Sequence, residues 1–294
     1  MIPGRMNKLF RRRQPVPEEV RAALSELARV VDDRPFLRPH AAVLAEILPV
    51  VFADSIEPAS PIDEERARAK LQAGVPFLNG ESVSFDVVEF KRRWQAICKS
   101  VARHAAGPNK SRLANLLGRD GWGCETLARD VLAGDISKIE SRAQSDDVAG
   151  EPLRTVLRFT LLPVLLRLRL QQAAALRQCP WQAGSCPVCG SWPLLAEFRG
   201  LEQIRFLRCG LCAADWEFPR LQCPHCDNRD HHQLGYFHVE QEEDKFRVAT
   251  CEKCQGYVKT ASTLGALDGP QLLVLDLETL HLDLAALDRG YRNP

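Results

Sequence analysis

The first part of the chain repeats apolar and polar positions with a period close to 3.6 residues, which is the period of an amphipathic helix. Pro17 and the two glutamates after it predict a helix start, because proline suits the first turn and acids favour the positive end of the helix dipole. The longest apolar segment predicts a central helix, kinked at Pro163. The predicted helices cover residues 17–30, 38–52, 63–73, 85–105, 111–117, 125–132 and 152–176.

Beyond Cys189 the apolar period changes from 3.6 to 2, which is typical of strands. A hairpin is expected around the acidic turn at 241–244. Residues 260–269 are expected to form a loop, followed by a short strand at 272–275 and a helix at 276–287 that packs back on the rest. The predicted strands cover residues 194–199, 204–208, 216–221, 233–239 and 245–250.

Cysteine spacing is the strongest chemical signal in the chain. Eight of its eleven cysteines form four pairs with identical C-x-x-C spacing inside a single segment. One such pair is weak evidence, but four in succession indicate two tetrahedral sites closed by two pairs each. Four thiolates suit either zinc or a single iron ion. The pairs are Cys186/Cys189, Cys209/Cys212, Cys223/Cys226 and Cys251/Cys254.

The four pairs can combine in three ways, and the spacing favours the sequential one. Cys186, Cys189, Cys209 and Cys212 would form one site, and Cys223, Cys226, Cys251 and Cys254 the other. Each half opens with C-P-x-C and closes with a plain C-x-x-C, which indicates a tandem duplication. Glycines in and near the pairs are expected to supply the positive φ of tight turns.

Two other roles for these cysteines are less favoured by the sequence. Disulfides are disfavoured, because a chain of this size does not need covalent staples. His225, His231 and His232 lie in or near the third pair, but eight cysteines already complete two ligand sets. Cys98 falls on an apolar helix face and is expected to pack as a small buried side chain, and Cys124 is also expected to be structural. Cys179, in the linker before the first pair, is expected to be a free thiol.

Composition fits a soluble globular protein, with 45% hydrophobic and 26% charged residues. The net charge of +1 is unevenly distributed. Residues 186–262 hold nine basic and eleven acidic residues, whereas a nucleic-acid-binding zinc ribbon should be basic. No apolar core of a signal peptide follows the basic start of the chain. The segment 159–166 is too short to span a bilayer, so we expect no membrane insertion.

These patterns predict an α+β protein. An all-helical domain, 1–178, would precede two tandem rubredoxin-like or zinc-ribbon β modules in 179–262, namely 186–212 and 223–254. Residues 263–294 would add a strand and a C-terminal helix. We find no P-loop, no G-x-S-x-G and no H-E-x-x-H motif, and therefore expect no enzymatic activity.

The residues around the cysteines also resemble a known family. The segments are C-P-V-C-G-S, R-F-L-R-C-G-L-C, C-P-H-C, T-C-E-K-C-Q-G-Y-V-K and D-L-E-T-L-H-L-D-L-A-A. In this order they closely resemble FdhE, the formate dehydrogenase accessory proteins. The resemblance covers roughly residues 159–291 with specific motifs and is diffuse over the helical first half.

The resemblance implies a cytoplasmic assembly factor for respiratory formate dehydrogenases. Such proteins bind the catalytic molybdenum subunit and carry rubredoxin-like iron sites on C-x-x-C motifs. That ligand role carries over to the eight paired cysteines, and it favours two mononuclear iron ions over zinc. Two alternatives stay open at this point: a zinc ribbon that binds nucleic acid or serves transcription, and a rubredoxin-like electron carrier.

Overall fold

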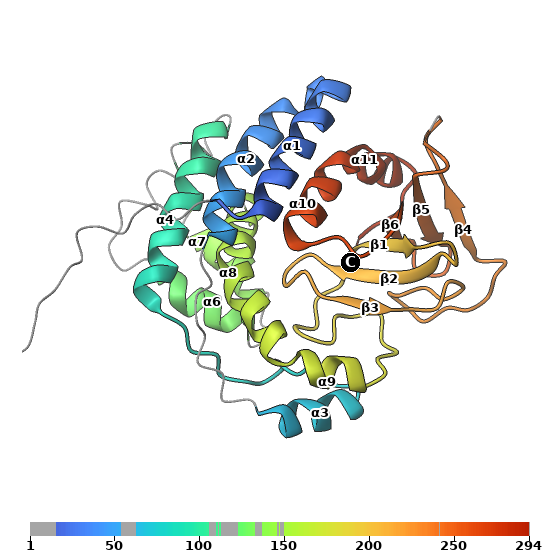
Figure 1. The fold of residues 1–294 in the computed structure, drawn as a ribbon, viewed down its shortest axis with the longest axis horizontal. Helices are drawn as coiled ribbons and strands as arrows, with labels where there is room; N and C mark the ends of the chain where they lie inside the picture. Colours follow the sequence, from blue (N-terminus) through green and yellow to red (C-terminus); the bar gives the residue numbers. More distant parts are fainter. Residues whose placement is uncertain are drawn as a thin grey trace, which may run out of the picture.

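The computed structural model describes residues 16–53, 63–105, 110, 112, 123–132, 137–145, 147, 150–240 and 242–293. Helices from the first half of the chain gather on one side of the molecule, and a β-sheet forms the other side (Figure 1). The last two helices lie between them. The protein is therefore α+β, as the hydrophobic pattern predicts.

The helices of the first half follow the predicted apolar faces closely. Their bounds are α1 Glu18–Asp33, the 3-10 turn η1 Pro35–Leu37, α2 Arg38–Phe52, α3 Glu64–Gln72, α4 Val87–His104, α6 Cys124–Leu132, α7 Ser137–Ser145, α8 Gly150–Gln171 and α9 Ala173–Gln178. Asp86 caps α4 by accepting from the backbone N–H groups of Val88 and Glu89. The helix α8 is buried along most of its length and packs against α2 and α4.

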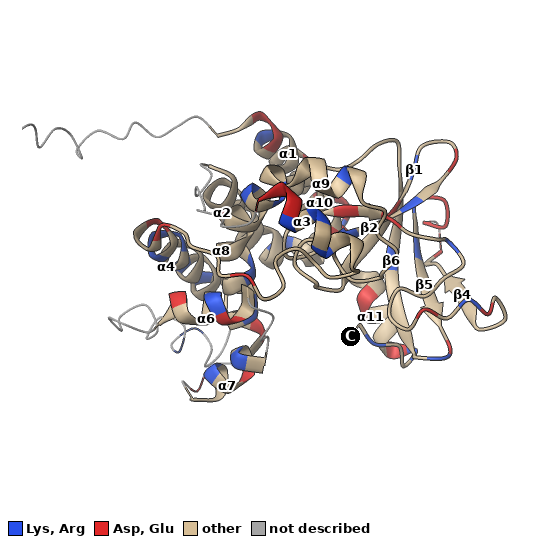
Figure 2. Cartoon of the chain, turned by 90° about the horizontal axis from the view of Figure 1, so that it is seen from below, with Lys and Arg blue, Asp and Glu red and all other residues tan. Residues whose placement is uncertain are grey.

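Two parts of this region differ from the prediction or lie beyond it. The polar segment that becomes α7 carries no strong apolar period, yet Ile139 and Ala143 bury one face of it. Of the helix expected at 111–117, the structure describes only residue 112, so this prediction is not tested. Acidic and basic positions are interspersed along both halves of the molecule (Figure 2).

One stretch of the described chain, Pro35–Phe52, is long and apolar enough to cross a bilayer by length and composition alone. Its mean hydropathy is 1.3 and a third of it is buried. It forms η1 and α2, which pack against α1, α4, α8 and the C-terminal part of the chain. Core helices pass the same test of length and composition, so this single stretch is weak evidence for a membrane span.

All six strands belong to one sheet, in the order β3-β2-β1-β6-β5-β4. The first three strands form an antiparallel meander, and the last three form another. The two meanders join through a parallel pairing of β1 with β6. The strands are β1 Pro193–Arg199, β2 Ile204–Cys209, β3 Asp215–Glu217, β4 Leu234–Phe237, β5 Phe246–Cys251 and β6 Gly256–Thr263.

The C-terminal segment corrects two expectations. Residues 260–263 continue β6 and are not loop. The run Leu272–Leu275, predicted as a strand, belongs to the helix α10, Gly269–Glu278. Asp268 and Gln271 form a capping box at its start, and Pro270 occupies the first turn. A short, wholly apolar run fits a buried helix as well as a strand, so the period alone could not distinguish them.

On one face of the sheet, α11, Leu280–Asp288, packs against β5 and β6, and α10 contributes Asp276. Lys259 on β6 points to this face, where its Nζ lies 2.9 Å from Asp276 Oδ1 and 2.7 Å from Asp283 Oδ2. Tyr257 donates to Asp283 on the same face, at 2.9 Å. Alternate residues of β6 must therefore point to the opposite face.

Candidate metal centres

Each of the four C-x-x-C pairs lies in a turn of the same shape. In every case the residue directly after the second cysteine has a positive φ, which turns the chain back toward the first cysteine. Only one of these four positions is a glycine. The residues are Gly190 with φ 76°, Ala213 with φ 55°, Asp227 with φ 56° and Gln255 with φ 56°.

Backbone hydrogen bonds close these turns in a repeated pattern, which we call the cysteine knuckle. In the first knuckle Cys186 N donates to Ser191 O and Gly190 N donates to Cys186 O, both at 2.9 Å. The knuckles that begin at Cys209 and Cys223 have the same two bonds, at 2.8 to 3.1 Å. The knuckle is thus a local structure whose hydrogen bonds close within a six-residue segment, such as 186–191.

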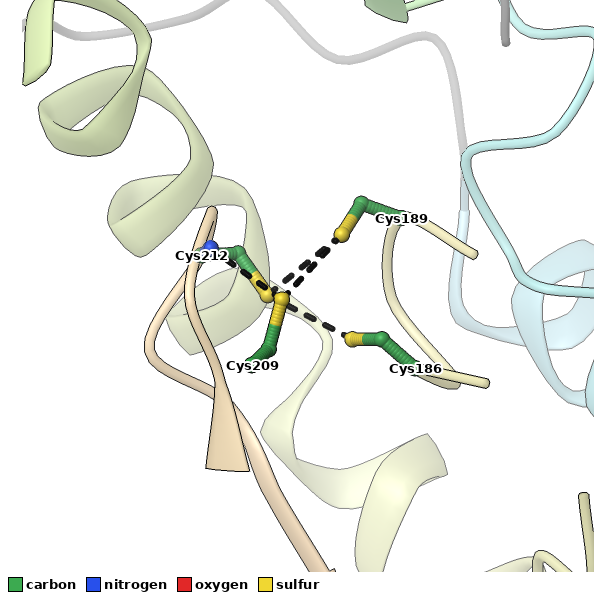
Figure 3. A group of neighbouring side chains, drawn as sticks. All are labelled: Cys186, Cys189, Cys209 and Cys212. Carbon is green, nitrogen blue, oxygen red and sulfur yellow. Dashed lines mark hydrogen bonds between the residues drawn. The ribbon is translucent and has the colours of Figure 1, made fainter. Parts of the chain in front are cut away.

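The first and second knuckles face each other and bring four sulfurs together (Figure 3). The Sγ atoms of Cys186 and Cys212 are 3.5 Å apart, as are those of Cys189 and Cys209. Cys189 Sγ lies 3.8 Å from Cys212 Sγ. Three of these four cysteines are fully buried, and Cys189 is partly exposed. We call this group the first cluster.

Backbone N–H groups point at the sulfurs of the first cluster. Val188 N lies 3.4 Å from Cys186 Sγ, and Leu211 N lies 3.3 Å from Cys209 Sγ. Such donors stabilise negative charge on sulfur, because an N–H dipole directs its positive end at the thiolate. Burial raises the pKa of the Cys186 thiol well above its usual range, whereas at Cys209 burial is outweighed by hydrogen bonds that hold the pKa well below it. The N–H groups thus oppose the cost of burying thiolates, which are the form of cysteine that binds metals.

The third and fourth knuckles form the second cluster. Cys223 Sγ lies 3.7 Å from Cys254 Sγ, and Cys226 Sγ lies 3.7 Å from Cys251 Sγ. Burial raises the pKa of the Cys251 thiol, but hydrogen bonds from the backbone of Cys254 and from the Asn228 side chain lower it to about 7. Cys254 is exposed, so this cluster is more accessible to solvent than the first.

Both clusters fit a mononuclear metal ion. The four sulfurs of each lie within 4.8 Å of one another. A tetrahedral ion with bonds of about 2.3 Å to sulfur requires an edge of about 3.8 Å between sulfurs, close to the separations found here. The clusters are the two sets that the sequential pairing predicts.

The helical half of the protein holds the first cluster in place. On α8, Arg158 Nε donates to Gly210 O at 2.7 Å and Arg169 Nη1 donates to Ala213 O at 2.6 Å. The segment after α3 adds two backbone bonds, from Phe77 N and Leu78 N to the carbonyl oxygens of the first knuckle. Sequence reasoning assigned α8 to the core and missed the arginines, since no local pattern indicates a partner 50 residues away.

The second cluster is held by the linker and the C-terminus. A Cβ added to Gly184 would lie 1.8 Å from Pro224 O, so only glycine fits against the third knuckle. At the fourth knuckle, Arg292 N donates to Gln255 O at 2.7 Å. Each cluster therefore depends on residues outside its own cysteine turns.

The predicted roles of the glycines need correction. Gly210 and Gly256 do not have a positive φ, unlike Gly190. Gly256 is required for space, because a Cβ there would lie 2.8 Å from His225 Cδ2 and 3.0 Å from Cys254 Sγ. At Gly210 a Cβ would lie 3.1 Å from Leu194 Cβ. These glycines serve close packing around the clusters.

His225 lies beside the second cluster, where its Nε2 is 3.1 Å from Tyr257 O, and the other candidate residues lie apart from both clusters. Cys98 and Cys124 are buried in the helical core, and burial raises the pKa of Cys98 to about 12. Cys179 is buried against α3, with its Sγ 3.9 Å from Arg68 O. His231 and His232 form an exposed group with Asp230, separate from the sulfurs.

Comparisons with known proteins agree with this arrangement. The family model of the "FdhE, central domain" matches residues 185–220, and that of the "FdhE, C-terminal domain" matches residues 221–294. The boundary between the two models falls between the second and third knuckles. Each match therefore contains one complete four-cysteine cluster.

Relatives with similar sequences carry the same description. A "Protein FdhE homolog" of Aquifex aeolicus (strain VF5) is 29% identical over 236 residues, which is 78% of this chain and 76% of the relative. A "Protein FdhE homolog" of Stutzerimonas stutzeri (strain A1501) is 39% identical over 109 residues, 36% of this chain and 35% of the relative. "Protein FdhE" of Escherichia coli O127:H6 is 25% identical over 68% of this chain and 63% of the relative.

A solved structure has a similar fold. It is the crystal structure of the FdhE protein from Pseudomonas aeruginosa. The match covers 95% of this chain and 95% of the chain in that crystal structure. The TM-score is 0.64 at 23% sequence identity. The similarity extends over the helical half, where the sequence motifs were diffuse.

Proposed function

The chain belongs to the FdhE family, and from this premise we propose that it is a cytoplasmic assembly factor for respiratory formate dehydrogenase. The observation that carries the proposal is the location of both four-cysteine clusters inside the two matched segments. In this role the protein binds the catalytic molybdenum subunit during maturation and catalyses no reaction itself.

We propose that each cluster holds one iron ion. A set of four thiolates suits iron or zinc, and the N–H groups aimed at Cys186 and Cys209 stabilise the charge that four thiolates place on the site. Iron bound in this way supplies one-electron redox chemistry. The exposed Cys254 makes the second cluster the more accessible of the two.

The clusters also stabilise the sheet. Each joins the two ends of one β-meander, because one knuckle precedes the meander and the other connects its last two strands. Small β units of this kind have little apolar core of their own, so metal binding contributes directly to their folding. The chain would then present a folded surface to its partner only when both sites are loaded.

Co-purification from cells that express formate dehydrogenase tests the partner. We expect the wild-type chain to recover the catalytic subunit, and the Cys186→Ser/Cys189→Ser variant to recover far less. Cys179→Ser is the matched control, since this thiol is buried outside both clusters. Failure of the wild-type chain to recover the catalytic subunit would contradict the proposed partner.

Anaerobic purification with metal analysis and a visible spectrum tests the metal. We expect two iron ions per chain and a coloured protein, because thiolate-to-iron charge transfer absorbs visible light. A colourless protein with two zinc ions would contradict the iron assignment. Binding to DNA at low salt would instead favour a zinc-ribbon function.

A further inference from the structure

A cavity of about 230 Å³ lies beside the second cluster, on the sheet face that α10 and α11 do not cover. On β6, Val258 and Thr260 line it, whereas Lys259 between them points to the helices. Cys223 and Cys251 of the second cluster lie in its wall. The loop 220–225 lines its other side.

The charged residues of this cavity all have the same sign. Arg205, Arg220 and Arg247 line it, and no aspartate or glutamate does. This contrasts with the excess of acidic residues in the segment 186–262 as a whole. Three guanidinium groups around one hollow create a positive potential, which low-dielectric walls strengthen.

Arg205 at the base of the cavity is only 3% exposed. Its Nη1 donates to Pro219 O at 3.3 Å and to Gln222 O at 3.1 Å, whereas its Nε has no hydrogen-bond partner among the described residues. Burial lowers the pKa of Arg205 to about 10, and the nearby Cys223 thiol opposes this. Its guanidinium also lies 5.7 Å from the centre of the Phe218 ring, and no carboxylate among the described residues pairs with it. This buried cation therefore lacks the carboxylate that usually accompanies it.

Arg220 and Arg247 are exposed at the mouth of the cavity. The Arg220 guanidinium lies 5.1 Å from the centre of the Phe198 ring, and that of Arg247 lies 5.3 Å from the centre of the Tyr236 ring. Among the described residues neither forms an ion pair with a carboxylate. Arg247 Nε also donates to Glu243 O at 2.9 Å, which leaves its Nη groups for a ligand. Guanidinium N–H groups at the edge of a stacked ring can bind oxyanions, in a bidentate manner where two are available.

The rest of the lining is mainly apolar. Leu221, Leu234, Ala249 and Val258 contribute aliphatic surface, and Tyr236 is an aromatic side chain that is 66% exposed. Ligand sites typically combine such apolar walls with a few polar groups that fix orientation. The ligand should therefore carry a compact apolar or aromatic body next to its charge.

We propose that this cavity binds an oxyanion, a carboxylate or a phosphate, carried on a small apolar or aromatic body. The three arginines bind the oxyanion, and the aliphatic and aromatic walls enclose the body. The proposal does not depend on the partner proposed above; because Cys223 and Cys251 line the cavity, it concerns the protein with its second cluster loaded. The alternative role for Arg205 is to balance the thiolates of the second cluster, and it predicts no ligand.

Calorimetric titration of the full-length protein tests the proposal with benzoate, phenyl phosphate and the neutral benzamide. We expect saturable binding of at least one of the two anions and none of benzamide, which has the shape of benzoate without its charge. The anion with the higher affinity shows whether the cavity prefers a carboxylate or a phosphate. Equal binding of benzamide and benzoate, or no binding of either anion, would overturn the proposal.

Variants of the exposed arginines supply the second test, because their replacement should not disturb folding. Arg220→Gln and Arg247→Gln should each weaken anion binding about tenfold, the ratio that corresponds to about 1.4 kcal/mol. Arg229→Gln is the matched control, since Arg229 is an exposed arginine near the second cluster that does not line the cavity. Unchanged affinity in the double variant Arg220→Gln/Arg247→Gln would refute the assignment.

Discussion

Arg158 on α8 donates a 2.7 Å hydrogen bond from Nε to the carbonyl oxygen of Gly210, inside the second knuckle. Its Nη2 also lies 3.6 Å from Asp276 Oδ2 on α10. One side chain thus joins the central helix, the first cluster and the C-terminal helices. The two halves of the protein are coupled at a metal site, and this coupling can be tested.

Arg158→Met should loosen the first cluster while keeping most of the apolar stem of the side chain. Loss of an outer partner of a metal site lowers metal affinity by about 10-fold or more. Competition with a coloured chelator would measure this affinity for each site. Arg154→Met, on the same helix but paired at the surface with Glu140, should leave both sites unchanged. Equal effects of both variants would show that Arg158 has no special role.

Gly184→Ala should destabilise the protein around the second cluster. The added Cβ would lie 1.8 Å from Pro224 O, a backbone atom that cannot move without displacing the third knuckle. Overpacking of this kind costs about 1–3 kcal/mol. Urea unfolding would measure the loss of stability, and metal analysis would measure the loss of metal from the second cluster. Gly265→Ala is the control, because nothing lies within 4 Å of a Cβ there; similar losses in both variants would argue against the steric cause.

The two clusters should release metal at different rates. Cys254 of the second cluster is exposed, whereas three cysteines of the first cluster are fully buried. A chelator in excess should therefore remove one metal ion per chain quickly and the other slowly. Cys254→Ser should abolish the fast phase and keep the slow one. A single phase in the wild-type chain would contradict the inference from exposure.

Lys259→Met should destabilise the packing of α10 and α11 on the sheet. Lys259 is 2% exposed, and its removal leaves Asp283 without its cation and Asp276 with Arg158 alone, at 3.6 Å. Breaking a buried pair on one side costs about 3–5 kcal/mol. The free energy of unfolding in urea measures the loss. Lys245→Met, which breaks a surface pair with Glu278, should cost less than about 1 kcal/mol.

Glu46 should make the helical half sensitive to acid. A hydrogen bond from Ser100 lowers its pKa, burial opposes this, and His104 and Arg103 lower it further, to about 2. Because the folded pKa is depressed, the stabilisation is present above the usual value of 4.5 and is lost as the pH falls toward 2. The difference in stability between wild type and Glu46→Gln should therefore shrink over this range. A constant difference from pH 6 to pH 3 would exclude the carboxylate as its source.

Several features of the fold were predictable because they depend on neighbours in sequence. The helix predicted at residues 38–52 matches α2, Arg38–Phe52, since an apolar face at helical spacing is a local property. The strands β1 and β2 follow from alternation in the same way. The run Leu272–Leu275 was assigned wrongly, because four consecutive apolar residues carry no period.

The grouping of the eight cysteines into two sets of four follows from the sequence, since a knuckle closes within six residues and the C-x-x-C spacing places both sulfurs on it. Tertiary structure alone decided the rest. Parallel pairing of β1 with β6 joins the two meanders into one sheet, and it brings Arg205 near Arg247 around the cavity. Pairings between strands so distant in the chain depend on packing over the whole protein, which no local pattern encodes.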